Sequence, residues 1–280
     1  MSADIKSETT RNVAFATSKD GTKIAFERVG SGPALIIVSG ALADRNGGKS
    51  LAGKLARHFT VYTYDRRGRG QSSDTKPYAV DREIEDLGAL IAHAGGKAYL
   101  YGVSSGAALT LQAAAKLGAA QVPKLAIYDA PYGQGEDDFN QQKVRINQLV
   151  QTGKPGDAAA FFLSAIGTPP QVLEELKQSP DWAGMSKMDF TLAYDYAVLG
   201  NGAVPETVKN ITAPTLVMNG EKSLPFMGST ADRIAELVPN AQRKILKGQA
   251  HGAAPDVVGP LLTEFFGERN EAQLSAVSGT

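Results

Sequence analysis

Short apolar runs alternate with helical patterns along this chain, and this alternation limits the possible folds more than any other feature. Residues 34–40 (ALIIVSG) form a continuous apolar, β-branched run, as expected for a strand covered on both faces. Similar runs follow at 59–65 and 97–103, and each is preceded by a helical pattern, at 48–59 and 81–96 respectively. The alternation predicts an α/β fold, with a mostly parallel sheet flanked by helices on both faces.

The alternation stops in the middle of the chain and then resumes. Between the apolar runs at 124–131 and 213–220, only helical patterns and loops occur. The sequence therefore predicts a helical lid, residues 133–209, inserted after the sixth strand of one α/β core. The core is predicted at 12–132 and 210–268, with flexible termini at 1–11 and 269–280.

Composition excludes several classes of function. Lysine plus arginine equals aspartate plus glutamate at 29 each, which does not favour nucleic-acid binding. The absence of cysteine excludes disulfides and thiolate metal sites. No run is apolar and long enough to span a membrane, and the polar start lacks a signal-peptide core, so we expect a cytoplasmic protein. No metal cluster or dinucleotide fingerprint is present, so we predict no metal and no cofactor.

One short motif lies at a junction between a predicted strand and a predicted helix. Residues 102–106 read Gly-Val-Ser-Ser-Gly, and a strand that turns directly into a helix needs small residues around the corner. Ser104 is the corner residue, which favours a nucleophile at the carboxyl edge of the sheet. The simpler alternative is that Ser104 or Ser105 only caps the helix.

A serine nucleophile needs a base, and the chain has three histidines. His251 follows the last predicted strand, after the serine in the chain, as this type of site requires. His58 and His93 precede strands, so they are expected at the opposite edge of the sheet. The sequence therefore favours His251 as the base.

Four segments together resemble the α/β-hydrolase superfamily, in its serine-nucleophile, esterase- and lipase-like branch. They are VSGAL (38–42), DRRGRGQS (65–72), GVSSG (102–106) and GQAHG (248–252), and they occur in the order typical of the family. The resemblance covers nearly the whole chain and implies that the helical insertion is a lid. It also implies that Asp65 holds the arginine-rich loop together.

The acid of the triad has several candidates. The family pattern resembles G-E-x-D after the lid, but here residues 220–223 read GEKS, with Ser223 in place of the aspartate. Asp129, at the end of the strand before the lid, is the favoured acid because some family members carry it there. Glu221 is the alternative, and a third possibility is that water or Ser223 orients the histidine.

The remaining predicted parts of the site are the oxyanion hole and the substrate pocket. Two backbone N–H groups are needed, and Ala41 and Ser105 are the expected donors, although Ser39 replaces the usual family histidine. Aromatic and methionine side chains in the lid predict an apolar pocket above Ser104. The predicted lining residues are Leu42, Tyr132, Trp182, Phe226 and Met227.

These residues predict a serine hydrolase that cleaves a carboxylic ester, lactone or thioester with an apolar group through an acyl-enzyme. Two other functions remain open on the same fold. One is a small-molecule-binding protein with little or no catalysis, which the missing aspartate in GEKS would support. The other is a lyase or cyclase that uses the pocket without acylation.

Overall fold

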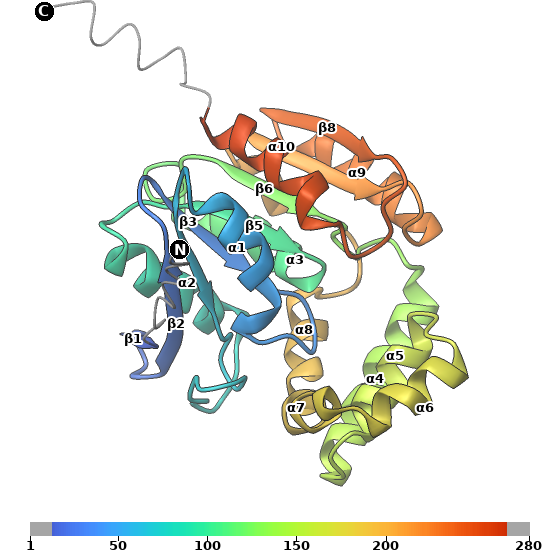
Figure 1. The fold of residues 1–280 in the computed structure, drawn as a ribbon. Coiled ribbons are helices and arrows are strands. Elements are labelled where there is room, and N and C mark those ends of the chain that lie inside the picture. Colours follow the sequence, from blue (N-terminus) through green and yellow to red (C-terminus); the bar gives the residue numbers. More distant parts are fainter. Residues whose placement is uncertain (1–12, 268–280) are drawn as a thin grey trace, which may run out of the picture.

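A computed structural model describes residues 13–267. The predicted flexible termini, 1–11 and 269–280, lie outside the described residues, and so do residues 12 and 268 of the predicted core. One sheet has eight strands in the order β1-β2-β4-β3-β5-β6-β7-β8. The first two pairings, β1 with β2 and β2 with β4, are antiparallel, and all later pairings are parallel. The predicted α/β architecture, with a mostly parallel sheet flanked by helices, is confirmed (Figure 1).

The strands are β1 (Ala14–Thr17), β2 (Lys23–Val29), β3 (Ala34–Val38), β4 (Thr60–Tyr64), β5 (Tyr99–Val103), β6 (Leu125–Tyr128), β7 (Thr215–Gly220) and β8 (Ala241–Leu246). The helices of the core are α1 (Lys49–Leu55), α2 (Val80–His93), α3 (Ser105–Leu117), α9 (Pro225–Leu237) and α10 (Pro255–Gly267). Between β6 and β7 lie α4 (Glu136–Thr152), α5 (Asp157–Ala165), α6 (Pro170–Gln178), α7 (Pro180–Met188) and α8 (Leu192–Val198).

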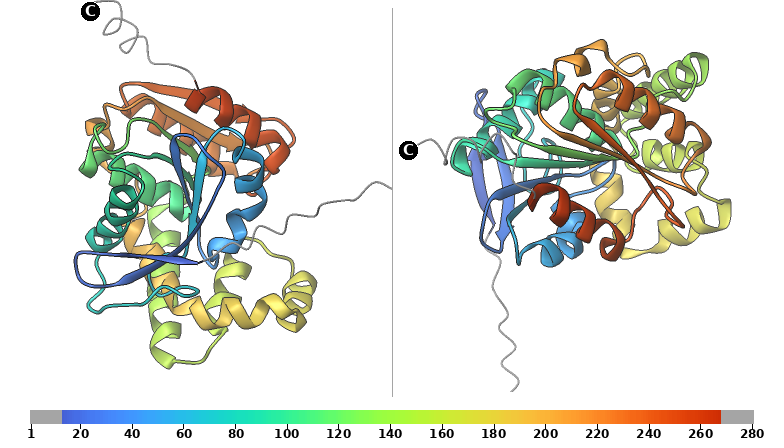
Figure 2. Two further views of the ribbon diagram at one scale, coloured as in Figure 1. Left: turned by 60° about the vertical axis from the view of Figure 1, so that its left-hand side comes forward. Right: turned by 90° about the horizontal axis from the view of Figure 1, so that it is seen from above.

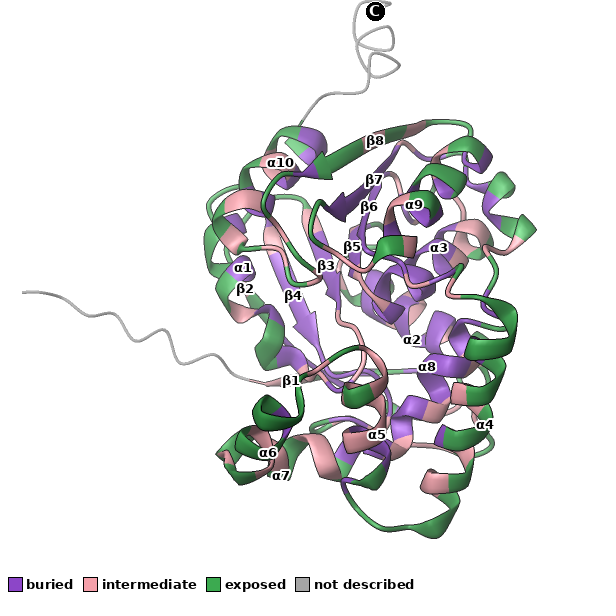
Figure 3. Cartoon of the chain, turned by 90° about the vertical axis from the view of Figure 1, so that its right-hand side faces the viewer, coloured by how far each residue is buried: buried purple, intermediate pink, exposed green. Residues whose placement is uncertain are grey.

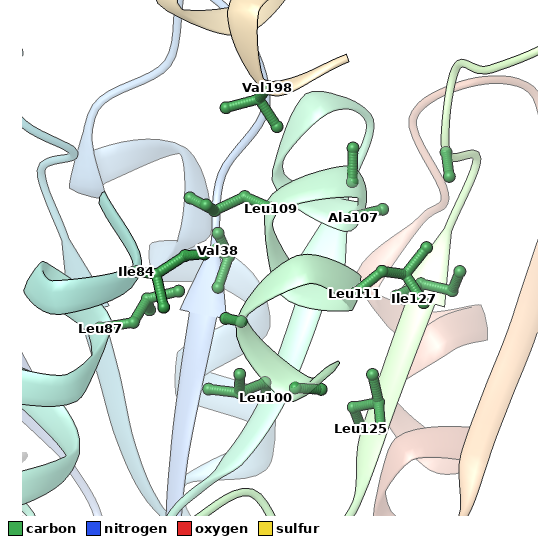
Figure 4. Packing of buried hydrophobic residues seen from close by; sticks show 14 of the residues in the cluster. Val38, Ile84, Leu87, Leu100, Ala107, Leu109, Leu111, Leu125, Ile127 and Val198 are labelled. Carbon is green, nitrogen blue, oxygen red and sulfur yellow. The ribbon is translucent and has the colours of Figure 1, made fainter. Parts of the chain in front are cut away.

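Each central strand is apolar on both faces because both faces are covered by helices. On β3, Leu35 and Ile37 pack with α1 and α10, whereas Ile36 and Val38 pack with α2 and α3. Figure 2 shows helices on the two sides of the sheet, and Figure 4 shows Val38 near the side chains of α2 and α3. Alternate side chains of one strand therefore enter two different cores, which explains the unbroken apolar run in the sequence.

The helical segment between β6 and β7, residues 133–210, is called the insertion below. Its helix α8 is mostly buried and α6 is mostly exposed (Figure 3). In Figure 1, α4 to α7 lie together beyond the carboxyl edge of the sheet, with α8 between them and the core.

Residues 186–200 (SKMDFTLAYDYAVLG), one of the helical patterns of the predicted lid, do not form one continuous helix. Helix α7 ends at Met188, a 3-10 turn covers Asp189–Thr191, and α8 then begins at Leu192. The Asp189 carboxylate accepts a hydrogen bond of 2.8 Å from the backbone N–H of Gly156, and the Thr191 hydroxyl donates to the Met188 carbonyl. These side-chain bonds to the backbone compete with regular helix, which periodicity alone does not reveal.

The parallel arrangement places the carboxyl ends of β3, β5, β6 and β7 at one edge of the sheet. The loops that follow these strands carry Ala41, Ser104, Asp129 and Ser223, so residues far apart in the sequence meet at this edge. In residues 13–267, no helix is long and apolar enough to cross a membrane.

Candidate active site

Ser104 lies at the corner between β5 and α3 with an unusual backbone conformation. Its φ is 56° and its ψ is −129°, a combination that is strained for a residue with a Cβ. The corner is held because the Ser104 N–H donates to the Tyr128 carbonyl at 3.0 Å and the Ala107 N–H donates to the Ser104 carbonyl at 2.8 Å. The side chain of Ser104 lines a cavity above the sheet edge.

The glycines of the motif are required by close backbone contacts. A Cβ on Gly106 would lie 2.2 Å from the Val38 carbonyl oxygen, and one on Gly102 would lie 2.5 Å from the Gly106 carbonyl oxygen. On the facing loop, a Cβ on Gly40 would lie 2.9 Å from the Cβ of Ser104. The strand, the helix and the loop after β3 can approach one another this closely only without those side chains.

Asp129 lies directly after β6 and is almost fully buried. Its φ of 51° is also in the left-handed region, and its N–H donates to the Met218 carbonyl on β7 at 3.0 Å. Its carboxylate accepts from the Gly220 N–H at 3.2 Å and the Ser223 hydroxyl at 2.5 Å, and its Oδ2 lies 3.2 Å from Nδ1 of His251.

The two other candidates for the acid have different partners. Glu221 is exposed, and its Oε2 accepts a hydrogen bond of 2.9 Å from the Gly248 N–H. Ser223, at the position where the family pattern has aspartate, donates its hydroxyl hydrogen to Asp129. Of the two predicted acids, Asp129 is therefore the one that the structure brings into hydrogen-bonding distance of His251.

The loop that carries His251 is attached to the sheet beside Asp129. The hydroxyl of Tyr128 donates to the carbonyl of Ala250, the residue before the histidine. Burial, with a smaller contribution from the nearby Asp129 charge, raises the pKa of Tyr128 to about 12, so this hydroxyl stays a donor at neutral pH. The His251 side chain is 39% exposed and lines the same cavity as Ser104.

The predicted oxyanion donors occupy two sides of this cavity. Ala41 follows β3 and Ser105 is the first residue of α3, and both line the cavity. The Ser105 N–H has no acceptor within its own helix because it belongs to the first turn. The positive end of the α3 dipole lies at the same point, which favours negative charge there.

The cavity has a volume of about 210 Å³ and a largely apolar lining. Besides Ala41, Ser104, Ser105, Ser223 and His251, it is lined by Pro131, Gln134, Gln142, Phe162, Ile166, Asp195, Tyr196, Leu199, Lys222, Leu224, Phe226, Met227 and Ala250. Two predicted pocket residues, Phe226 and Met227, belong to this lining.

Three predicted pocket residues lie outside the lining, and the prediction is corrected for them. Leu42 and Tyr132 are buried in the hydrophobic core. Trp182 packs over Gly156, where a Cβ would lie 3.0 Å from the indole ring. Aromatic and aliphatic side chains are equally suited to a core and to a pocket, so composition could not separate the two.

The sequence did not reveal Asp195, which comes from α8 of the insertion and reaches the cavity. It is buried and binds Arg66 and Arg69, two arginines of the loop after β4 that are themselves buried. An aspartate within the apolar pattern of residues 192–199 was the available signal, because a carboxylate on a buried helix face requires a partner.

The remaining predicted residues lie elsewhere. Asp65 accepts hydrogen bonds of 2.8 Å from the backbone N–H groups of Arg45 and Gln71, which agrees with its expected role in holding the arginine-rich loop. His93 is exposed at the end of α2 and packs against Phe26. Among the side chains that the structure describes, no cluster of histidine, aspartate and glutamate could hold a metal ion.

Comparison with known proteins adds independent findings. A family model described as "Alpha/beta hydrolase family" matches residues 35–262. A crystal structure of an alpha/beta hydrolase from Sphaerobacter thermophilus DSM 20745 is 45% identical, with a TM-score of 0.82 over 90% of this chain and 100% of the other.

Two curated proteins are also similar. The uncharacterized hydrolase YraK of Bacillus subtilis (strain 168) is 37% identical over 95 residues, so the match spans only 32% of this chain and 35% of YraK. A non-heme haloperoxidase of Rhodococcus erythropolis is 23% identical over 253 residues, which are 85% of this chain and 92% of that protein.

Proposed function

This chain belongs to the α/β-hydrolase family and is an enzyme of that family, and on this premise we propose that it cleaves a small carboxylic ester, lactone or thioester through an acyl-enzyme. The observation that carries the proposal is the buried Asp129 carboxylate, which lies 3.2 Å from Nδ1 of His251. This contact leaves Nε2 as the ring nitrogen that can act as the base. His251 and Ser104 line one cavity.

In the proposed reaction, the Ser104 hydroxyl oxygen attacks the carbonyl carbon of the substrate while His251 takes its proton at Nε2. Asp129 orients the imidazole and stabilises the imidazolium. The N–H groups of Ala41 and Ser105 stabilise the tetrahedral oxyanion. Its collapse breaks the bond to the leaving group, which takes the proton from His251. Water, activated by His251, then attacks the acyl-enzyme and releases the acid and free Ser104.

The cavity supports a small substrate with an apolar group. Its volume of about 210 Å³ is below the roughly 300–1,000 Å³ of pockets that hold drug-sized ligands. Phe162, Ile166, Leu199 and Met227 contribute apolar surface to it. We therefore expect turnover to be fastest for short-chain esters and to fall as the acyl chain grows longer than the cavity.

The alternative of a binding protein without catalysis depended on the missing aspartate at position 223. This support is weaker because Ser223 binds Asp129, so the carboxylate that the histidine needs is supplied from β6 instead of β7. A serine nucleophile also remains compatible with acyl transfer to acceptors other than water.

The first test is intact mass after exposure of the whole chain to a fluorophosphonate probe. We expect one adduct on the wild type, none on Ser104→Ala, and labelling about a hundredfold slower for Asp129→Asn. The matched control is Glu221→Gln, which removes the other candidate carboxylate and should label at the wild-type rate. An unlabelled wild type would contradict the proposed hydrolase and favour ligand binding without acylation.

A further inference from the structure

A buried group of charges joins the insertion to the two segments that carry the proposed oxyanion donors. Arg66 and Arg69, from the loop after β4, and Asp195, from α8, are each at most 2% exposed. We call these three residues the Arg66–Arg69–Asp195 cluster. Arg66 Nη1 lies 2.7 Å from Asp195 Oδ1, and Arg69 Nη2 lies 2.8 Å from both carboxylate oxygens.

On the side of α3, the cluster binds the residue that follows the nucleophile. The Ser105 hydroxyl donates to Asp195 Oδ1 at 2.7 Å, and Arg66 Nη1 lies 3.3 Å from the same hydroxyl oxygen. Ser105 is only 2% exposed, so this bond is shielded from water. The position of the first turn of α3, with its N–H groups, is therefore tied to a carboxylate of the insertion.

On the side of β3, the cluster binds the peptide unit of the other proposed donor. Arg69 Nη1 donates to the Gly40 carbonyl at 2.5 Å. This carbonyl and the Ala41 N–H belong to one planar, trans peptide and point in opposite directions. A guanidinium held on the oxygen side therefore sets the direction of the N–H on the other side and polarises the peptide.

The charges of the cluster are balanced only together with that of Glu83, next to the point where the proposed reaction develops negative charge. Burial alone would raise the pKa of Asp195, but Arg69 and Arg66 hold it below the ordinary value, so the carboxylate is ionised. Glu83 of α2 accepts from the remaining face of Arg66 at 2.7 and 2.8 Å. Asp195 lines the cavity, but both of its carboxylate oxygens accept hydrogen bonds from buried guanidinium groups, which does not suit it to act as a base.

We propose that the Arg66–Arg69–Asp195 cluster positions both backbone donors of the oxyanion hole, so that the hole is complete only when α8 of the insertion is seated on the core. Its members are positioning residues, since they act through the Ala41 and Ser105 peptides. This inference rests on the proposed hydrolase function. It assigns to the insertion a part in transition-state stabilisation in addition to its contribution to the cavity wall.

The test compares two buried aspartates of the same insertion. Asp195→Asn removes the charge that holds Arg69 and Arg66, whereas Asp189→Asn alters a carboxylate that binds only backbone N–H of the insertion, at Gly156 among others. Both variants should lose thermal stability. Only Asp195→Asn should lower kcat for a short-chain ester, by about a hundredfold, because removing one oxyanion donor costs 10²–10³. KM should change by less than about threefold, since the ground-state carbonyl makes weaker use of the hole.

A second measurement isolates the oxyanion. A trifluoromethyl ketone adds to Ser104 as a tetrahedral adduct with an oxyanion, so its inhibition constant should rise in Asp195→Asn in parallel with the loss of kcat/KM. If Asp195→Asn does not fold, Ser105→Ala removes the bond from α3 to the cluster while leaving both arginines paired. We expect it to lose about tenfold in kcat and in trifluoromethyl ketone affinity, with KM unchanged.

The outcomes separate this inference from the proposed function. If wild type reacts with the fluorophosphonate and Asp195→Asn matches Asp189→Asn in kcat and inhibitor affinity, the positioning role is wrong and the hydrolase stands. If kcat and KM of Asp195→Asn change together while inhibitor affinity stays at the wild-type value, the role is also wrong. If wild type does not react at all, both proposals are overturned.

Discussion

The hydroxyl of Ser223 donates a hydrogen bond of 2.5 Å to the carboxylate of Asp129, although the two residues follow different strands. Residue 223 is where the family pattern has aspartate, and residue 129 is one strand earlier in the sheet. The serine therefore lies beside the carboxylate that meets His251 and serves as a donor to it.

We predict that Ser223→Ala lowers kcat/KM for a short-chain ester by about tenfold, because a hydrogen bond to a charged group contributes roughly 1.5–3 kcal/mol and the Gly220 N–H remains as a second donor. Steady-state kinetics on the purified variant measure this. Ser229→Ala, an exposed serine on α9, is the control and should keep wild-type kinetics. Equal kinetics for all three proteins would mean that Ser223 does not hold Asp129 in place.

A second prediction concerns Gly106, two residues after the proposed nucleophile Ser104. Gly106→Ala should yield no folded protein, or one with a large loss of stability, because its Cβ would lie 2.2 Å from the Val38 carbonyl oxygen. Gly53→Ala, in α1, meets nothing within 4 Å and should stabilise the chain by about 0.5–1 kcal/mol. Urea unfolding of both variants measures the difference, and a Gly106→Ala protein as stable as wild type would contradict this packing.

A third prediction concerns the length of the acyl group. Phe162→Ala enlarges the cavity, so the kcat/KM ratio of octanoate to butyrate esters should rise by about tenfold, since one methylene in an apolar pocket is worth about 1–3 kcal/mol. Phe161→Ala removes the neighbouring side chain, which packs on the core and is not in the cavity lining. It should lose stability and keep the wild-type ratio, whereas equal ratios for both variants would place the acyl group elsewhere.

A fourth prediction concerns acid stability. Burial raises the pKa of Asp20, but hydrogen bonds from Thr22 and from the Arg67 guanidinium outweigh it and lower the pKa to about 2. A depressed carboxylate pKa contributes stability that is complete above the unfolded-state value near 3.9 and is lost as the pH falls toward 2. Asp20→Asn should therefore be less stable than wild type at pH 6, by about 1 kcal/mol or less.

The stability difference between wild type and Asp20→Asn should shrink as the pH is lowered from 5 to 3, measured by urea midpoints. Glu175→Gln, at an exposed position on α6, is the matched control for the loss of one carboxylate. A difference for Asp20→Asn that stays constant or grows toward pH 3 would show that the ion pair with Arg67 does not supply this stability.

Several features of this molecule were determined by the sequence alone because they depend on local physics. The alternation of apolar strands with helices predicted the parallel sheet, since a strand covered on both faces must be apolar on both. The small residues at 102 and 106 predicted the sharp corner at Ser104, because backbone contact at such a corner excludes side chains. Chain order indicated which histidine lies at the carboxyl edge.

Tertiary structure alone decided which side chains meet there. Asp129 and Glu221 are both acidic residues at the ends of adjacent strands, and only their orientation separates a partner of His251 from a partner of Gly248. Asp195 is 90 residues from Ser105 in the chain, and its bonds to Ser105, Arg66 and Arg69 form only when α8 packs on the core. A buried charge needs a partner of opposite charge, and here the partners are far apart in the sequence. No local sequence pattern can therefore indicate which residues will pair.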